Sequence, residues 1–73
     1  MKMIYVRIRH LREDSDLSQI RFAQILCISQ RSLSHYENGT REIPINTLIK
    51  IADYFDCSID YLLERTSKRQ LNR

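Results

Sequence analysis

Residues 30–38 carry polar side chains at the spacing of one helix face. At about 100° per residue, five side chains that form hydrogen bonds fall within an arc of about 140°, and they are Gln30, Arg31, Ser34, His35 and Asn38. Leu33 and Tyr36 fall nearly opposite. Gln bonds the adenine edge at two atoms, Arg bonds guanine, and Ser and Asn suit phosphate or base contacts. Such a helix, about 13 Å long, fits a DNA major groove, although an ordinary solvent-facing helix surface is the alternative.

Charge is distributed unevenly along the chain. Residues 1–41 hold seven basic and four acidic residues, residues 42–64 hold one and five, and residues 65–73 hold four and none. The front half and the end are therefore basic, with an acidic segment between them. This asymmetry can mark one face for a polyanion, and a solvated helix surface is again the alternative.

Catalytic and metal-binding patterns are missing from the sequence. A chain of 73 residues is one domain with little room for a deep cleft. His10 and His35 lack metal-ligand spacing, and a single Gly excludes a glycine-rich phosphate loop. We expect no enzymatic activity, no metal and no cofactor. Cys27 and Cys57 are predicted to be small buried hydrophobic residues, and a disulfide between them is the less favoured alternative.

Apolar runs are too short for a membrane span or a secretory signal. We therefore expect no membrane partner and a cytoplasmic location. Apolar residues instead recur at helical spacing, which predicts an all-α fold. The expected helices run from about Met3 to Asp14, from Ser18 to about Leu26, from Ser29 to about Asn38, from Pro44 through Leu48 to Phe55, and from Ser58 through Ile59 to Leu63. Residues 1–65 form the predicted domain and residues 66–73 a basic, frayed tail.

Local signals mark the ends of the central helices. Ser18 and Ser29 are good N-cap residues, and Pro44 suits the first turn of a helix. Gly39 follows residues 30–38 directly and fits a C′ residue with positive φ. Two capped helices joined by a short turn are the helix-turn-helix arrangement.

Short motifs along the chain occur in a characteristic order. They are Leu11-Arg12-Glu13, Leu17-Ser18-Gln19, Phe22-Ala23, Ile28-Ser29-Gln30, Tyr36-Glu37-Asn38-Gly39, Leu48-Ile49-Lys50-Ile51-Ala52 and Ser58-Ile59-Asp60-Tyr61-Leu62-Leu63. Together they resemble the Cro/lambda-repressor-like helix-turn-helix family, also called the XRE family, over roughly residues 8–63. The resemblance implies a five-helix domain in which the third helix contacts DNA bases.

The resemblance and the polar helix face together give a set of candidate DNA contacts. The predicted base-contacting residues are Gln30, Arg31, Ser34 and His35. The predicted phosphate-contacting residues are Ser18, Gln19, Asn38 and Arg41. Arg12 and Glu37 match a family ion pair that ties the first helix to the end of the third. Two independently solvated charges are the alternative.

Two positions depart from the family pattern. Cys27 and Asp16 stand where members often carry Gly. Positive φ is strained for Cys and milder for Asp, so these changes concern the turn geometry and remove no contact residue.

The leading hypothesis is a small transcriptional regulator, a repressor, that binds a double-stranded DNA operator in a sequence-specific way. The family implies a homodimer, since two half-sites lie about 34 Å apart. Tyr61 and Leu62 are the predicted dimer contacts, and the alternative is that both belong to the monomer core. The other functional hypothesis is an antitoxin or another interaction module whose main partner is a protein such as a toxin.

Overall fold

The computed structural model describes residues 6–63, and within them the secondary structure is entirely helical. The helices are α1 (Val6–Asp14), α2 (Gln19–Leu26), α3 (Gln30–Glu37), α4 (Ile45–Phe55) and α5 (Ile59–Leu62). This confirms the predicted all-α, five-helix fold. The expected start of the first helix at Met3, the domain boundary at residue 65 and the tail 66–73 lie outside the described residues.

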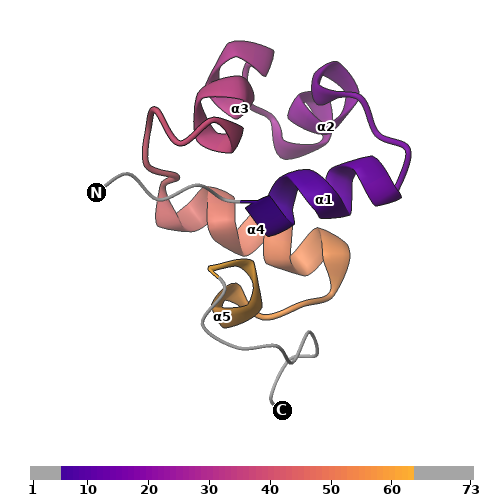
Figure 1. Cartoon of the computed structure of the whole chain (residues 1–73), viewed down its shortest axis with the longest axis vertical. Coiled ribbons are helices and arrows are strands. Elements are labelled where there is room, and N and C mark those ends of the chain that lie inside the picture. The colour runs from indigo at the N-terminus through magenta and orange to yellow at the C-terminus, as the bar shows by residue number, and fades with distance from the viewer. Residues whose placement is uncertain (1–5, 64–73) are drawn as a thin grey trace.

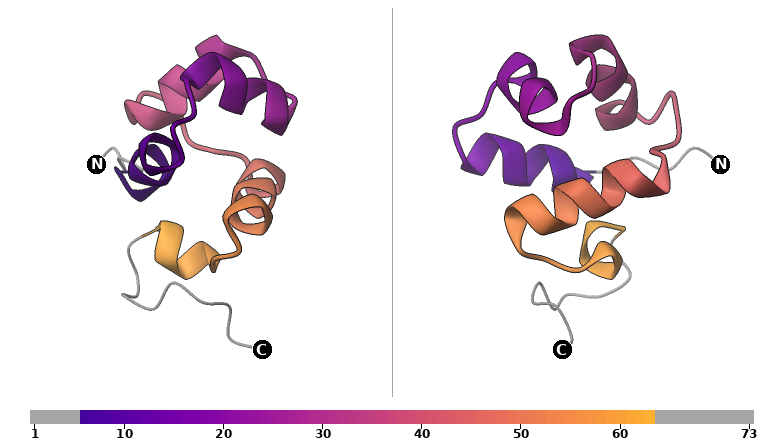
Figure 2. Two further views of the ribbon diagram at one scale, coloured as in Figure 1. Left: turned by 90° about the vertical axis from the view of Figure 1, so that its right-hand side faces the viewer. Right: turned by 180° about the vertical axis from the view of Figure 1, so that it is seen from behind.

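The helices are arranged in layers, as Figures 1 and 2 show. α2 and α3 lie side by side at one end of the molecule, α1 and α4 lie beneath them, and α5 lies at the other end. α1 packs against both α3 and α5, so it joins the two ends. The surface formed by α2 and α3 is therefore free of any covering helix among residues 6–63.

Every helix contributes apolar side chains to a single core. The largest fully buried side chains are Ile8, Phe22, Leu26, Leu33, Ile51, Leu62 and Cys57. Phe22 packs against Phe55 with ring centroids 5.4 Å apart, and Tyr54 meets Phe55 edge-on at 5.1 Å. Such tilted and edge-on contacts are the arrangements that aromatic pairs prefer. The Phe22–Phe55 contact joins α2 to α4 beneath the helix-turn-helix.

Four helices end with the same backbone geometry. At the C′ residue of each, φ is positive: 57° at Asp16, 58° at Cys27, 73° at Gly39 and 51° at Asp56. The next N–H in the chain bonds back to a carbonyl five residues earlier, as in Leu17 to Arg12 at 3.1 Å and Cys57 to Ala52 at 3.0 Å. This is the Schellman motif, which satisfies carbonyls left open at a helix end.

Two expectations about particular residues were wrong. Cys27 is exposed, whereas Cys57 is buried, because Cys27 occupies the C′ position of a surface turn and Ile28 after it packs on the core. Pro44 is the N-cap of α4 and not a first-turn residue. Its φ of −61° fits either position, but its ψ of 148° is extended, so helical geometry begins at Ile45.

The short apolar runs of the sequence predict that no helix spans a membrane. Among residues 6–63, no helix has both the length and the apolar character that crossing a bilayer requires.

Candidate nucleic-acid interface

The two faces of α3 differ as the sequence predicts. Leu33 is 0% exposed and Tyr36 is buried beside it in the core. Of the predicted DNA contacts on this helix and its C-cap, Gln30, Arg31 and Asn38 are exposed, and Ser34 and His35 are half-buried. The Ser29 hydroxyl accepts a hydrogen bond from the Ser32 amide at 3.0 Å and so caps the start of α3. The polar face of α3 is therefore open to a ligand.

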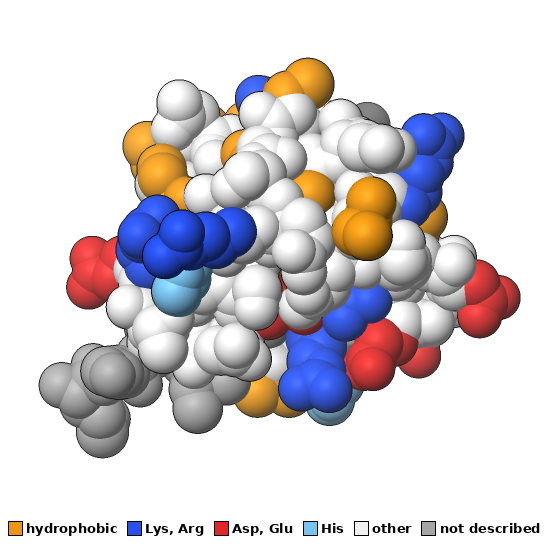
Figure 3. Space-filling view, turned by 90° about the horizontal axis from the view of Figure 1, so that it is seen from above, with side chains coloured by type: hydrophobic (Ala, Val, Ile, Leu, Met, Phe, Trp, Pro, Cys, Tyr) orange, Lys and Arg blue, Asp and Glu red, His pale blue; other side chains and the backbone are white. Residues whose placement is uncertain are grey.

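The surface formed by α2 and α3 has few acidic side chains. Figure 3 views this side and shows mainly backbone and uncharged side chains over its centre, hydrophobic side chains among them, with Lys and Arg side chains towards its edges and Asp and Glu at its margins. The side chains of Arg31 and Arg41 are exposed and make no hydrogen bond or ion pair with any other residue in the described part of the chain. Both guanidinium groups are therefore available to phosphates or to guanine.

The predicted ion pair between Arg12 and Glu37 is present and buried. Arg12 Nε donates to Glu37 Oε2 at 2.7 Å, and Arg12 Nη2 donates to Glu37 Oε1 at 3.1 Å. The two residues are 9% and 4% exposed. Arg12 Nη1 also donates to the carbonyl of Leu17 at 2.7 Å. This bidentate pair fixes the C-terminal end of α3 to α1 and to the chain entering α2.

Hydrogen bonds continue from this pair to the exposed face of α3. Gln19 Nε2 donates to Glu37 Oε1 at 3.0 Å, and Gln30 Nε2 donates to Gln19 Oε1 at 2.7 Å. We call the series Arg12–Glu37–Gln19–Gln30 the amide relay. It brings together predicted contacts from the start of α2 and the start of α3. It also orients the Gln30 amide, whose carbonyl oxygen and second N–H remain free for an adenine edge.

The remaining predicted contacts make local bonds. Ser18 accepts from the Arg21 amide at 3.0 Å and caps α2, which leaves its hydroxyl hydrogen available. Asn38 Nδ2 donates to Ser34 Oγ at 3.4 Å. His35 Nδ1 lies 2.8 Å from Thr40 Oγ1. Sequence reasoning missed Thr40, although its place directly after the C′ residue Gly39 puts it at the end of α3.

The proposed dimer contacts lie at the opposite end of the molecule. Leu62 is 0% exposed, so its side chain belongs to the monomer core and offers no surface to a second copy. Tyr61 is half-buried, with the Arg7 guanidinium 4.2 Å above its ring centroid and Arg7 Nη1 donating to its carbonyl at 2.9 Å. The alternative assignment to the core therefore holds for Leu62.

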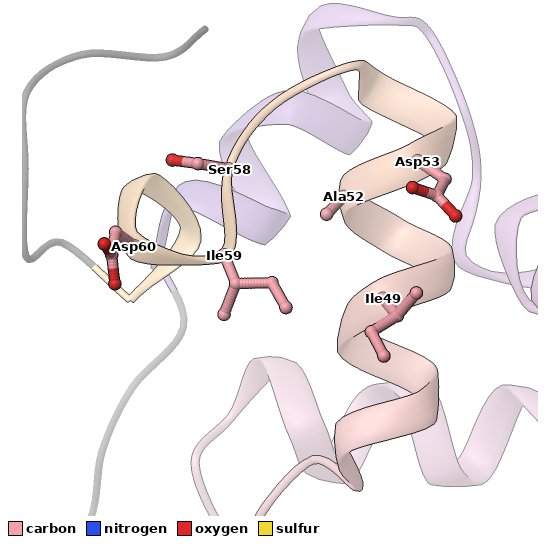
Figure 4. A pocket seen from close by; sticks show the side chains of 6 residues that line it. All are labelled: Ile49, Ala52, Asp53, Ser58, Ile59 and Asp60. Atoms are coloured by element: carbon pink, nitrogen blue, oxygen red, sulfur yellow. The ribbon is translucent and has the colours of Figure 1, made fainter. Parts of the chain in front are cut away.

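An open hollow of about 280 Å³ separates the outer sides of α4 and α5. Figure 4 shows its lining side chains, which are Ile49, Ala52, Asp53, Ser58, Ile59 and Asp60. Its titratable groups are two carboxylates, and no cluster of three potential metal-binding side chains occurs in residues 6–63. The hollow therefore carries negative charge, whereas the surface around α3 exposes amide and guanidinium groups.

Comparison with known proteins places these features in a family. The model of the helix-turn-helix family matches residues 8–62. Antitoxin PezA of Streptococcus pneumoniae is 43% identical over 56 residues, which are 77% of this chain and 35% of PezA. The HTH-type transcriptional regulators YqaE and ImmR of Bacillus subtilis are 33% and 30% identical over 94% and 90% of this chain.

The chain spans only part of these curated relatives, namely 60% of YqaE and 52% of ImmR. A solved structure of a transcriptional regulator from Listeria innocua superposes with a TM-score of 0.78 at 23% identity, and the match covers 99% of this chain and 68% of that one. That likeness supports the fold. Since the family model covers most of the chain and the helix-turn-helix is present in its geometry, this protein belongs to the Cro/lambda-repressor-like (XRE) helix-turn-helix family.

Proposed function

We propose that this chain is a sequence-specific double-stranded DNA-binding regulator, a repressor, that acts in the cytoplasm. α3 enters the major groove, and Ser18 and Gln19 at the start of α2 meet the phosphate backbone. One observation carries the proposal. The exposed face of α3 presents amide, guanidinium, imidazole and hydroxyl groups, while the single carboxylate of the helix, on Glu37, is buried against Arg12. The face of α3 that would meet DNA therefore exposes no carboxylate that would repel the phosphates.

Binding to duplexes selected from a random library tests this function directly. Phosphate contacts release counterions, so log K should fall with log salt by about 0.9 for each neutralised phosphate. Arg41→Ala should reduce that slope by about 1 per protomer and leave the preferred sequence unchanged. A salt-independent affinity, or failure to enrich any sequence, would contradict the proposal.

Gln30→Ala, unlike Arg41→Ala, should change the preferred DNA sequence. Removing the amide deletes a bidentate base contact, so discrimination at one operator base pair should weaken by about 1–3 kcal/mol. The salt slope should remain that of the unchanged protein, because Gln30 carries no charge. The same selection applied to both variants separates base contact from phosphate contact. An unaltered preference in Gln30→Ala would reject its assignment to base contact.

We further propose that two chains bind one operator, since related half-sites lie one helical turn apart, about 34 Å. Tyr61 on α5 remains a proposed dimer contact, and Leu62 is no longer one because its side chain is buried. The stoichiometry of the duplex titration measures this: two chains per operator are expected, and one chain per fully protected site would reject the homodimer.

A protein partner is the second candidate function, supported by the 43% identity to antitoxin PezA. The exposed apolar side chains Ile45 and Ile49 lie on α4, a different helix from the one that carries the proposed base contacts. Under this alternative, the product of the neighbouring gene would co-purify with the chain even when Gln30 and Arg31 are both replaced by Ala. Loss of that complex in an Ile49→Asp variant would locate it on α4.

A further inference from the structure

Three contacts tie Thr40 to His35 at the end of α3. The Thr40 amide donates to the His35 carbonyl at 3.0 Å as part of the Schellman motif. The Thr40 hydroxyl donates to the same carbonyl at 3.2 Å. Thr40 Oγ1 is also 2.8 Å from His35 Nδ1. Thr40 therefore contacts the His35 carbonyl through its amide and its hydroxyl, and the His35 ring through its hydroxyl.

The number of hydrogens on the Thr40 hydroxyl favours one direction for its bond to the ring. A hydroxyl has one hydrogen, and a carbonyl oxygen only accepts. While the Thr40 hydrogen points at the His35 carbonyl, its oxygen offers a lone pair to Nδ1, and in this arrangement Nδ1 carries the hydrogen. The opposite arrangement would sacrifice the hydroxyl bond to a carbonyl at the negative end of the helix dipole.

We propose that Thr40 is a positioning residue that holds neutral His35 as the Nδ1–H tautomer, so that a bare Nε2 acceptor faces the operator. In the major groove an acceptor pairs with an amino group, which only adenine N6 and cytosine N4 provide. The DNA part of this inference rests on the proposed function and adds the chemical class of base edge that His35 contacts. The tautomer itself is a property of the protein without DNA.

The tautomer is measured by nitrogen NMR of the imidazole rings in the full ¹⁵N-labelled chain, under mildly alkaline conditions where imidazoles are neutral. Nδ1 of His35 should give the signal of a protonated nitrogen and Nε2 that of an unprotonated one. Thr40→Val keeps the side-chain shape and removes the hydroxyl, so the Nε2–H form should gain population. Thr40→Ser keeps the hydroxyl and should behave as the unchanged protein.

His10 is exposed on α1 and serves as the internal control, because its ring signals should be the same in every variant. An unchanged amide spectrum in Thr40→Val shows that the fold is intact. A protonated Nε2 in the unchanged protein, or an identical His35 tautomer in Thr40→Val, would overturn the proposal.

The consequence for DNA is tested by selection of duplexes. His35→Ala should weaken discrimination at one base pair on the order of tenfold. Thr40→Val should weaken discrimination at that same base pair, and Thr40→Ser should not. If Thr40→Val left the preference intact where His35→Ala relaxed it, the positioning role would be rejected. If the unchanged chain bound no duplex, the proposed function would fail, while the NMR measurement would still decide the tautomer.

Discussion

Arg12→Ala should lower the free energy of unfolding by about 3–5 kcal/mol, because it leaves the Glu37 carboxylate buried without its cation. Glu37 would keep only the bond from Gln19 Nε2. Small domains have total stabilities towards the low end of about 5–15 kcal/mol. A loss of this size therefore removes most of the stability and populates the unfolded chain.

Urea denaturation followed by circular dichroism measures this loss, and the chain contains a matched control. Arg9 and Glu13 form a second ion pair at 3.6 Å on the same helix, with side chains 56% and 50% exposed. Arg9→Ala should cost no more than about 1 kcal/mol, since solvent screens exposed pairs. If Arg12→Ala cost no more than Arg9→Ala, the structural role of the buried pair would be refuted.

The double variant Arg12→Met with Glu37→Met adds a sharper test. Replacing both charges by apolar groups leaves no uncompensated ion in the core, so it should be more stable than either single variant. A double variant whose loss equals the sum of the two single losses would mean that the two charges act independently.

Leu33→Ala should destabilise the domain by about 2–5 kcal/mol without removing any proposed DNA contact. Leu33 is 0% exposed on the inner face of α3, and its truncation removes apolar burial and leaves a cavity. Apparent DNA affinity should fall only in proportion to the folded fraction. The preferred operator sequence should stay the same.

Arg31→Ala is the matched control on the exposed face of α3. It should change the free energy of unfolding by no more than about 0.5 kcal/mol, as surface substitutions usually do, yet weaken base discrimination by about 1–3 kcal/mol. Denaturation curves and duplex selection on both variants make the comparison. A changed operator preference in Leu33→Ala, or unfolding of Arg31→Ala, would contradict the division of α3 into a packing face and a DNA face.

Local sequence signals predicted most of the helical architecture. Ser18, Ser29 and Ser58 cap the helices that follow them, because a hydroxyl acceptor before an amphipathic run satisfies open amides nearby in sequence. Gly39 ends α3 with positive φ for an equally local reason. Periodicity also separated Leu33 from Arg31, since helix geometry fixes which side each residue faces.

Features that depend on tertiary packing were harder to predict. Asp56 takes a positive φ of 51° without the glycine that would announce it. Leu62 and Tyr61 are adjacent in sequence, and only the packing of α5 against α1 and α4 shows that Leu62 is fully buried. The Arg12–Glu37 pair followed from family resemblance, because no local rule joins residues 25 positions apart.

The amide relay constrains how this protein could diverge in evolution. Gln19 bonds both the buried Glu37 and the exposed Gln30, so we expect an exchange at position 19 to affect both the buried ion pair and the proposed base contact. Arg31 has no such attachment within residues 6–63. Under the proposed function, an exchange at Arg31 would change a DNA contact without disturbing these bonds, whereas an exchange at Gln30 would require a compatible side chain at position 19, so the effects of substitutions at positions 19 and 30 should depend on each other.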